Sequence, residues 1–407
     1  MHLRDLPRVV WALAAARFVT SAASFTMLFL TLYLTGPRDV GTAGAGLLAG
    51  SVGVGALAGN FTGGRWGDRL GHRRVLLVAS GSGGLLLAGV PLLPVWALAV
   101  ALPVAAYLLA TGSLSAGALA ASAMPRGERR TAVAVHRAAS NAGFVVGPPL
   151  GALLVTWSYD ALFVVDGLSV VLVRLVLSRV LPADAVASTE RATGPGLWRS
   201  VRADRALLVL LVGVVLVDLA YRQLYSTLPL HLRDSGQPVW LYASVIAAGS
   251  GLILLLEIPV TQWLHGRDAL GIVATGYALV GLGTAMFALP VTVVSVLAAM
   301  LVLTVGEILY KTTATAHVLD QAPDHLVGQY QGLYTGAATS GTLLAAPVGT
   351  AVYAAAPGLL WPLMAAMALA AAAVVLLARR LGEVSPPRTP AATPRGSRGT
   401  APSRRAG

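Results

Sequence analysis

Residues 64–74 read GRWGDRLGHRR and stand between two long apolar stretches, residues 43–64 and 75–94. Each stretch has about 20 residues, the length that an α-helix needs to cross a bilayer core roughly 30 Å thick. The connection between them carries four arginines and one aspartate. This alternation of membrane-length apolar stretches with short basic connections decides the fold class of the chain.

The same alternation continues in both directions and predicts an all-α integral membrane protein with twelve transmembrane helices. Of the 407 residues, 56% are hydrophobic and 11% are charged, with a mean hydropathy of +0.74. A soluble domain is about 45–50% apolar. The stretches are long rather than alternating, which argues against a β-barrel. The expected spans are residues 9–34, 43–64, 75–94, 96–122, 132–155, 161–181, 206–232, 240–264, 269–289, 291–319, 330–354 and 358–378.

Arginines gather on one side of these predicted helices. The other side receives only Arg38 and Arg233. Because short basic loops stay cytoplasmic, both termini are expected inside. The net charge of +12 is spread over these loops and does not form one surface, so no nucleic-acid partner is expected. The basic side holds Arg4, Arg8, residues 65–74, 126–130 and 179–205, Arg267, and the tail from Arg379.

The chain is predicted to consist of two six-helix halves, residues 1–181 and 206–381. Residues 182–205 mix Pro, Asp, Glu and Arg and are expected to form a cytoplasmic linker. Residues 382–407 are rich in Pro, Arg, Thr and Ala and are expected to be a disordered basic tail.

A shift of 198 residues aligns the two halves with each other. It places residues 30–34 on 228–232, and it also superimposes two Gly/Pro patterns. Matches at a shared offset indicate duplicated parallel halves, a plan that places the substrate site between the halves near the bilayer midplane. The superimposed residues are Gly143, Pro149 and Gly151 on Gly341, Pro347 and Gly349.

Two motifs have a physical rationale. In residues 64–74, Gly64 and Gly71 are expected to permit a tight turn and Asp68 to cap or pair with a neighbouring helix end. The basic side chains are expected to anchor to lipid phosphate or acidic partners. An ordinary basic loop explains this charge but not the spaced glycines and acid. The basic side chains are Arg69, Arg73 and Arg74.

The second motif, GFVVGPPLGA at residues 143–152, lies in the fifth predicted helix. Its glycines allow a neighbouring helix to approach closely, and its prolines remove backbone donors and bend the helix. The glycines are Gly143, Gly147 and Gly151, and the first proline is Pro148.

Residues 64–74 resemble the loop signature G-x-x-x-D-R-x-G-x-R-R of the major facilitator superfamily. Residues 143–152 are similar to the G-x-x-x-G-P-x-x-G motif of its drug:proton antiporters, and residues 305–307 and 322–334 look like bacterial efflux members. The resemblance covers about residues 9–378. It implies a monomer in a bacterial cytoplasmic membrane, working by alternating access without a cofactor. In the family, the positions matching Asp68 and its neighbouring arginines lock the outward-facing state and release it inward.

Several charges fall inside predicted spans, where each costs roughly 2.5–3.5 kcal/mol on the most lenient scale. Two pairs are four residues apart and are expected to neutralise each other, either structurally or as functional groups. Arg17 is expected to be an interhelical tether or a cavity residue, and Asp166 is expected to face the outer interface. The pairs are Asp218 with Arg222, and Glu307 with Lys311.

Glu257 has no basic residue within one helical turn, so its carboxyl must be protonated, paired across helices or open to a cavity. Glu257 and Glu307 are therefore the candidate proton carriers. The sequence departs from better-known proton-driven relatives, since its first predicted helix has no acid and its fourth has no charge. The site of proton coupling cannot be transferred from those relatives.

Three functions remain open. The leading one is proton-driven efflux of amphipathic or drug-like molecules, with a role in drug resistance; the second is import or facilitated passage of sugars or other nutrients. The third is a membrane-embedded enzyme or sensor. No Walker A, H-E-x-x-H or G-x-S-x-G sequence is present, and the absence of cysteine excludes disulfides and Cys-based metal sites. We expect neither a metal nor an enzymatic activity.

Overall fold

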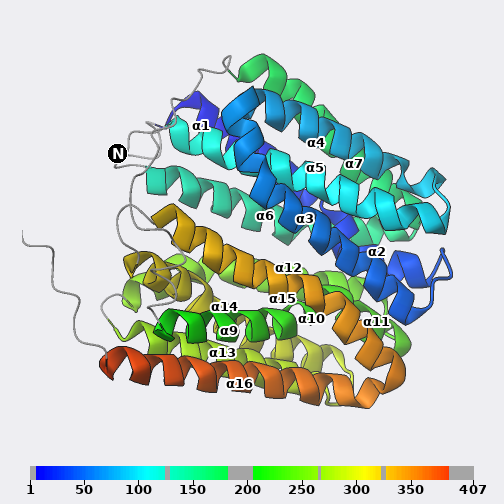
Figure 1. Ribbon diagram of the computed structural model, residues 1–407. Helices are drawn as coiled ribbons and strands as arrows, with labels where there is room; N and C mark the ends of the chain where they lie inside the picture. Colours follow the sequence, from blue (N-terminus) through cyan, green and yellow to red (C-terminus); the bar gives the residue numbers. More distant parts are fainter. Residues whose placement is uncertain (1–5, 124–128, 182–204, 265–266, 322–326, 385–407) are drawn as a thin grey trace, which may run out of the picture.

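The computed structural model describes residues 6–123, 129–181, 205–264, 267–321 and 327–384, and within these ranges all regular structure is helical. The predicted linker lies outside these ranges except for Arg205, which begins a helix, and the predicted tail lies outside them except for residues 382–384. Two helical bundles lie side by side in Figure 1, one formed by α1–α7 and the other by α9–α16. The domain boundaries themselves stay predictions.

The first bundle follows the predicted spans with one difference. The first span, expected to be continuous, is broken at Ala23 and Ser24 into α1 and α2. Its helices are α1 (Arg8–Ala22), α2 (Phe25–Thr35), α3 (Thr42–Leu70), α4 (His72–Gly89), a short 3₁₀ turn (Val90–Leu92), α5 (Val95–Ser122), α6 (Arg129–Val155) and α7 (Tyr159–Val180).

The second bundle repeats this plan. The seventh predicted span is also broken, here at Arg222 and Thr227. Its helices are α9 (Arg205–Tyr221), α10 (Gln223–Ser226), α11 (Leu228–Asp234), α12 (Val239–Trp263), α13 (Ala269–Met286), α14 (Val293–Asp320), α15 (Val327–Ala355) and α16 (Pro357–Val384).

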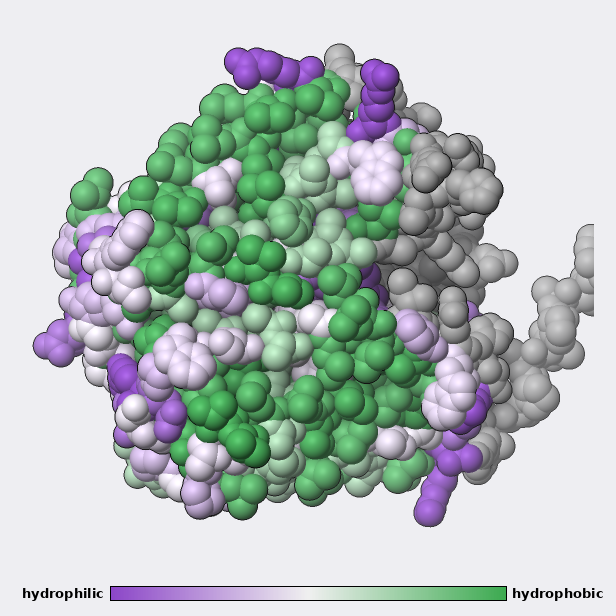
Figure 2. Space-filling model, turned by 180° about the vertical axis from the view of Figure 1, so that it is seen from behind, coloured by the Kyte–Doolittle hydropathy of each residue, from purple (hydrophilic) through white to green (hydrophobic). Residues whose placement is uncertain are grey.

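Eleven stretches of the described chain are long and apolar enough to cross a membrane. The remaining predicted span is α15, whose 29 residues rise about 43 Å and so exceed the bilayer core. Its many Gly, Thr and Gln residues lower its hydropathy, and it packs against α3 and α9. Hydrophobic side chains cover most of the face shown in Figure 2, as a lipid-facing surface requires.

The internal offset of 198 residues reappears in the packing. A Cβ atom added to Gly143 of α6 would meet Phe18 O at 2.6 Å, and one added to Gly341 of α15 would meet Val215 O at 2.7 Å. The corresponding helix pairs, α6 with α1 and α15 with α9, therefore approach through equivalent glycines.

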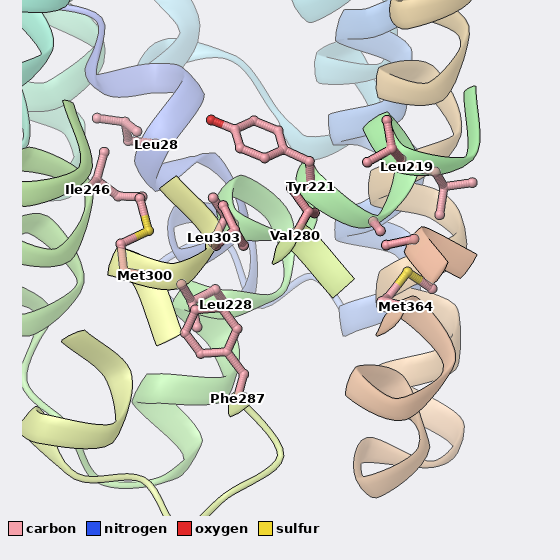
Figure 3. Close-up of a cluster of buried hydrophobic side chains, with 14 of the residues drawn as sticks. Leu28, Leu219, Tyr221, Leu228, Ile246, Val280, Phe287, Met300, Leu303 and Met364 are labelled. Atoms are coloured by element: carbon pink, nitrogen blue, oxygen red, sulfur yellow. The ribbon is translucent and has the colours of Figure 1, made fainter. Parts of the chain in front are cut away.

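The outer side of the molecule, opposite the arginine-rich loops, is closed by contacts between the bundles. Phe29 of α2 packs edge-on against Tyr242 of α12, with ring centres 5.9 Å apart. Figure 3 shows Leu28 of α2 beside Ile246 of α12 within the buried hydrophobic cluster. Helix α2 also packs against α10 and α11. We call these contacts the outer seal.

Candidate functional site

The turn within residues 64–74 occurs at Gly71 alone. Gly71 has a φ of +89°, a left-handed backbone conformation that favours glycine, and it separates α3 from α4. Gly64 lies inside α3, so the expectation that Gly64 contributes to a turn was wrong. Helix α3 continues past Gly64 and ends at Leu70.

Arg73 makes a contact that the sequence did not suggest. Its Nη2 donates to Ser178 O at 2.6 Å and its Nε donates to Leu181 O at 3.1 Å. These carbonyl groups belong to the end of α7, where a helix has unpaired acceptors and a negative dipole end. Arg73 thus fastens α4 to α7 and is not simply a lipid anchor. Arg69 and Arg74 are exposed, whereas the side chain of Asp68 is outside the described part.

The glycines of the 143–152 motif form the face of α6 that meets the broken first span. A Cβ atom added at Gly147 would meet Ala22 O at 2.7 Å, and one at Gly151 would meet Phe25 Cδ1 at 2.8 Å. Pro148 is buried inside α6. The expected close helix approach is present, and it occurs within the first bundle.

A charged cluster lies inside the second bundle. Lys311 Nζ donates to Glu307 Oε1 at 2.6 Å, and Tyr221 Oη donates to Glu307 Oε2 at 2.7 Å. The Glu307 side chain is 6% exposed but that of Lys311 is 42% exposed. The predicted Glu307–Lys311 pair therefore forms, with its acid buried and its base reaching an opening.

Lys311 lies among aromatic side chains of the second bundle. Tyr334 of α15 is within electrostatic reach of both Lys311 and Arg137 of α6. The ammonium group also lies 5.0 Å from the ring centre of Tyr221. The only lysine of the chain thus belongs to a charged and aromatic cluster of the second bundle.

The other predicted pair does not form a direct ion pair within the described structure. Arg222 stands at the junction of α9 and α10, and its backbone N–H still donates to Asp218 O at 2.9 Å, as in a regular helix. Its Nε is buried without a hydrogen-bond partner among the described residues, and its guanidinium lies 5.7 Å from the ring centre of Tyr225. Asp218 is 6% exposed and packs against Gly341. The two side chains make no direct contact, but their charges interact, in keeping with the expectation that they lie within reach of each other and can neutralise one another.

Glu257 is paired across the bundles. Its carboxylate accepts a hydrogen bond from Arg137 Nη2, which joins α12 of the second bundle to α6 of the first. Of the three alternatives for Glu257, the structure therefore selects pairing between helices. Sequence reasoning missed Arg137, although it lies inside a predicted span and a full count of span charges would have found it.

A cavity of about 210 Å³ lies inside the first bundle. Arg17 lines it and donates from Nε to Ser140 Oγ at 3.1 Å, so Arg17 is both a tether and a cavity residue. His136 and Arg174, which sequence reasoning also missed, line the same cavity. Both residues lie inside predicted spans, so a search of the spans for charged and polar side chains would have found them.

Asp166 also lines this cavity and is 6% exposed, so the expectation that it faces the outer interface was wrong. Its Oδ2 accepts a hydrogen bond from Thr26 N at 3.1 Å. Thr26 is in the first turn of α2, where backbone N–H groups have no partner within the helix. Asp166 therefore caps α2 from another helix, which makes the break in the first span tolerable.

Two bundles of membrane-length helices with many hydrophobic side chains on the surface define a multi-pass membrane protein. A family model described as Major Facilitator Superfamily matches residues 12–346. The chain belongs to the Major Facilitator Superfamily.

Relatives and solved structures agree with this assignment. The chain is 24% identical over 339 residues to the MFS-type transporter YqjV of Bacillus subtilis (strain 168), covering 81% of this chain and 82% of the relative. It is 26% identical over 370 residues to a Na(+), Li(+), K(+)/H(+) antiporter of Planococcus maritimus, covering 81% and 86%. A peptide transporter POT structure superimposes with a TM-score of 0.77 at 15% identity, covering 94% and 96%. These relatives are transporters and not enzymes.

Proposed function

We propose that this transporter exports small amphipathic molecules in exchange for protons, with Glu307 as the proton carrier. The observation that carries the proposal is the Tyr221–Glu307–Lys311 chain of hydrogen bonds inside the second bundle. A buried acid held by a base that reaches an opening can exchange protons with water while it remains shielded from lipid.

The exchange works through the charge of Glu307. When Glu307 is ionised, it accepts hydrogen bonds from Lys311 and Tyr221, and the Glu307–Lys311 ion pair has no net charge. When Glu307 takes a proton, Lys311 loses the carboxylate that it is hydrogen-bonded to, and the cluster gains one positive charge inside the membrane-spanning part of the protein. The cost of that charge favours a different arrangement of the bundles, so protonation biases the equilibrium between inward-open and outward-open states.

The Arg137–Glu257 ion pair supports a second role in the same cycle. It joins the two bundles on the arginine-rich side of the membrane midplane and holds α6 against α12. We assign it as a tether between the bundles and not as the proton carrier. Substitutions of the two acids should therefore have different effects. A change at Glu307 should alter proton exchange, and a change at Glu257 should alter the balance between the two conformations.

Everted membrane vesicles test the proposal directly. Vesicles energised by respiration acidify inside, and a fluorescent cationic dye that exchanges for protons dissipates this gradient and accumulates. We expect Glu307→Gln to abolish substrate-dependent proton release. The control is Asp39→Asn, because Asp39 is an exposed outer-loop acid with a φ of +51°, a conformation that Asn tolerates. Proton release by Glu307→Gln at the wild-type rate would overturn the assignment of Glu307.

Exchange of monovalent cations for protons is a second candidate. The similarity to the Planococcus maritimus antiporter favours it. The same vesicles discriminate the two, since addition of Na⁺, Li⁺ or K⁺ without dye would collapse the proton gradient only for a cation antiporter. Uptake of the dye into intact cells against its own concentration gradient would indicate import.

A further inference from the structure

The cavity inside the first bundle is separate from the Glu307 cluster. Its wall comes from α1 to α7, and no residue of the second bundle lines it. Apolar side chains form most of the wall, and four ionisable side chains on three helices also line it. These groups are Arg17 of α1, His136 of α6, and Asp166 and Arg174 of α7.

The charges of this cavity do not cancel among the described residues. The wall carries two guanidinium groups and one carboxylate, which leaves an excess of one positive charge with His136 neutral. The carboxylate of Asp166 is already engaged by Thr26 N. Arg17 contacts Ser140, and neither arginine forms an ion pair with a described acid. Arg17 and Arg174 are close enough to repel each other.

Two buried nitrogen atoms at this cavity also lack hydrogen-bond partners among the described residues. They are Arg174 Nε and His136 Nδ1. Arg174 Nε is always a donor, and a buried donor without a partner costs about 1–3 kcal/mol, and more when the group is charged. An excess cation inside the bilayer adds a further cost. Both costs fall if an anion occupies the cavity.

We propose that this cavity binds a small monovalent anion, a halide or a short carboxylate, held by Arg17 and Arg174. The occupant neutralises the excess charge and accepts the hydrogen bonds that the guanidinium groups do not make within the protein. The proposal does not depend on which substrate is transported or in which direction.

The volume of the cavity limits the size of the ligand that it can hold. A volume of about 210 Å³ corresponds to roughly seven water molecules at about 30 Å³ each. Pockets for drug-sized ligands are about 300–1,000 Å³. The cavity therefore suits a hydrated small ion, and a drug-like substrate needs the larger space between the bundles.

Thermal unfolding of the purified protein in detergent tests the proposal. The probes are sodium chloride and sodium formate, each compared with sodium HEPES at equal ionic strength, because the HEPES anion is too bulky for the cavity. An anion that binds only the folded state raises Tm. We expect an increase on the order of 3 °C when saturating chloride or formate replaces HEPES. Equal Tm values in all three salts would overturn the proposal.

Variants locate the effect. Arg174→Gln and Arg17→Gln should each lose most of the anion-dependent shift, whereas Arg179→Gln should keep it, because Arg179 is exposed at the end of the same helix. An undiminished shift in both cavity variants would place the anion elsewhere and overturn the proposal. If neither cavity variant folds, chloride-35 NMR of the wild type decides, since line broadening that formate competes away supports the site and its absence refutes it.

Discussion

Thr35 and Arg233 are 198 residues apart, at equivalent positions of the two halves, and Arg233 Nη1 donates to Thr35 Oγ1 at 2.7 Å. The internal repeat thus brings its own corresponding residues together at the outer seal. The outer ends of the first and seventh predicted spans meet there, which closes one side of the molecule. A transporter that alternates between two open states must separate this contact in each cycle.

Locking α3 against α15 should stop transport. A Cβ atom at Gly53 would lie 3.6 Å from Leu343 Cβ, within the range of about 3.5–4.5 Å for disulfides. Because the chain has no cysteine, Gly53→Cys with Leu343→Cys creates a single possible bond. We expect oxidation to abolish dye transport and reductant to restore it. The matched control is Leu85→Cys with Leu343→Cys, since Leu85 is exposed on α4; loss of transport in that pair would refute the interpretation.

Exchanging the charges of Arg137 and Glu257 should restore the transport activity that each single substitution reduces. Glu257→Arg leaves two cations facing each other, and Arg137→Glu leaves two anions, so each is expected to reduce transport. The double variant restores opposite charges. Because Arg137 is 46% exposed, the coupling energy should be about 0.5–1 kcal/mol in a double-mutant cycle on Tm. Additive effects of the two changes would show that the pair does not act as a unit.

Removing the Tyr221 hydroxyl should destabilise the protein. Tyr221→Phe leaves Glu307 Oε2 without its donor, at a cost of about 1–3 kcal/mol in the free energy of unfolding. Tyr310→Phe is the control, because the Tyr310 hydroxyl is buried and has no hydrogen-bond partner among the described residues. Thermal unfolding followed by tryptophan fluorescence compares them. Equal losses would mean that the hydroxyl bond to Glu307 contributes nothing.

Side chains added to the α6 motif should push α6 away from α1. Gly147→Ala places a Cβ atom 2.7 Å from Ala22 O, and overpacking of this kind costs about 1–3 kcal/mol. Gly81→Ala, where an added Cβ atom meets nothing within 4 Å, should be neutral or stabilising because alanine favours helix. Detergent-solubilised yield and Tm measure both variants. A Gly147→Ala protein as stable as Gly81→Ala would contradict the packing role of the motif.

Asp68→Asn should impair transport while membrane insertion remains intact. This prediction rests on the family pattern in residues 64–74, in which the matching acid controls the change between states. Dye efflux from whole cells measures activity, and the amount of protein in the membrane fraction measures insertion. Wild-type efflux by Asp68→Asn would remove the basis for transferring the family role to this residue.

The charged residues show where sequence reasoning reached its limit. Glu307 and Lys311 were correctly paired because four residues on one continuous helix fix their relative direction. Asp218 and Arg222 have the same spacing on a helical backbone, but Asp218 packs against Gly341 and the Arg222 guanidinium lies beside the Tyr225 ring. Spacing places two side chains on one helix face, and the packing around each decides whether they touch.

The sequence by itself determined the fold class, the helical spans, the internal repeat and the family, because the bilayer imposes length and hydropathy on every span. Only the tertiary structure decided the partners of charges that are paired with a different helix. Glu257 pairs with Arg137 120 residues away, and Asp166 caps α2 from 140 residues away. Such partners depend on the rotation and packing of helices about their own axes. Hydropathy does not encode these rotations, since it constrains only whether a residue lies in the membrane.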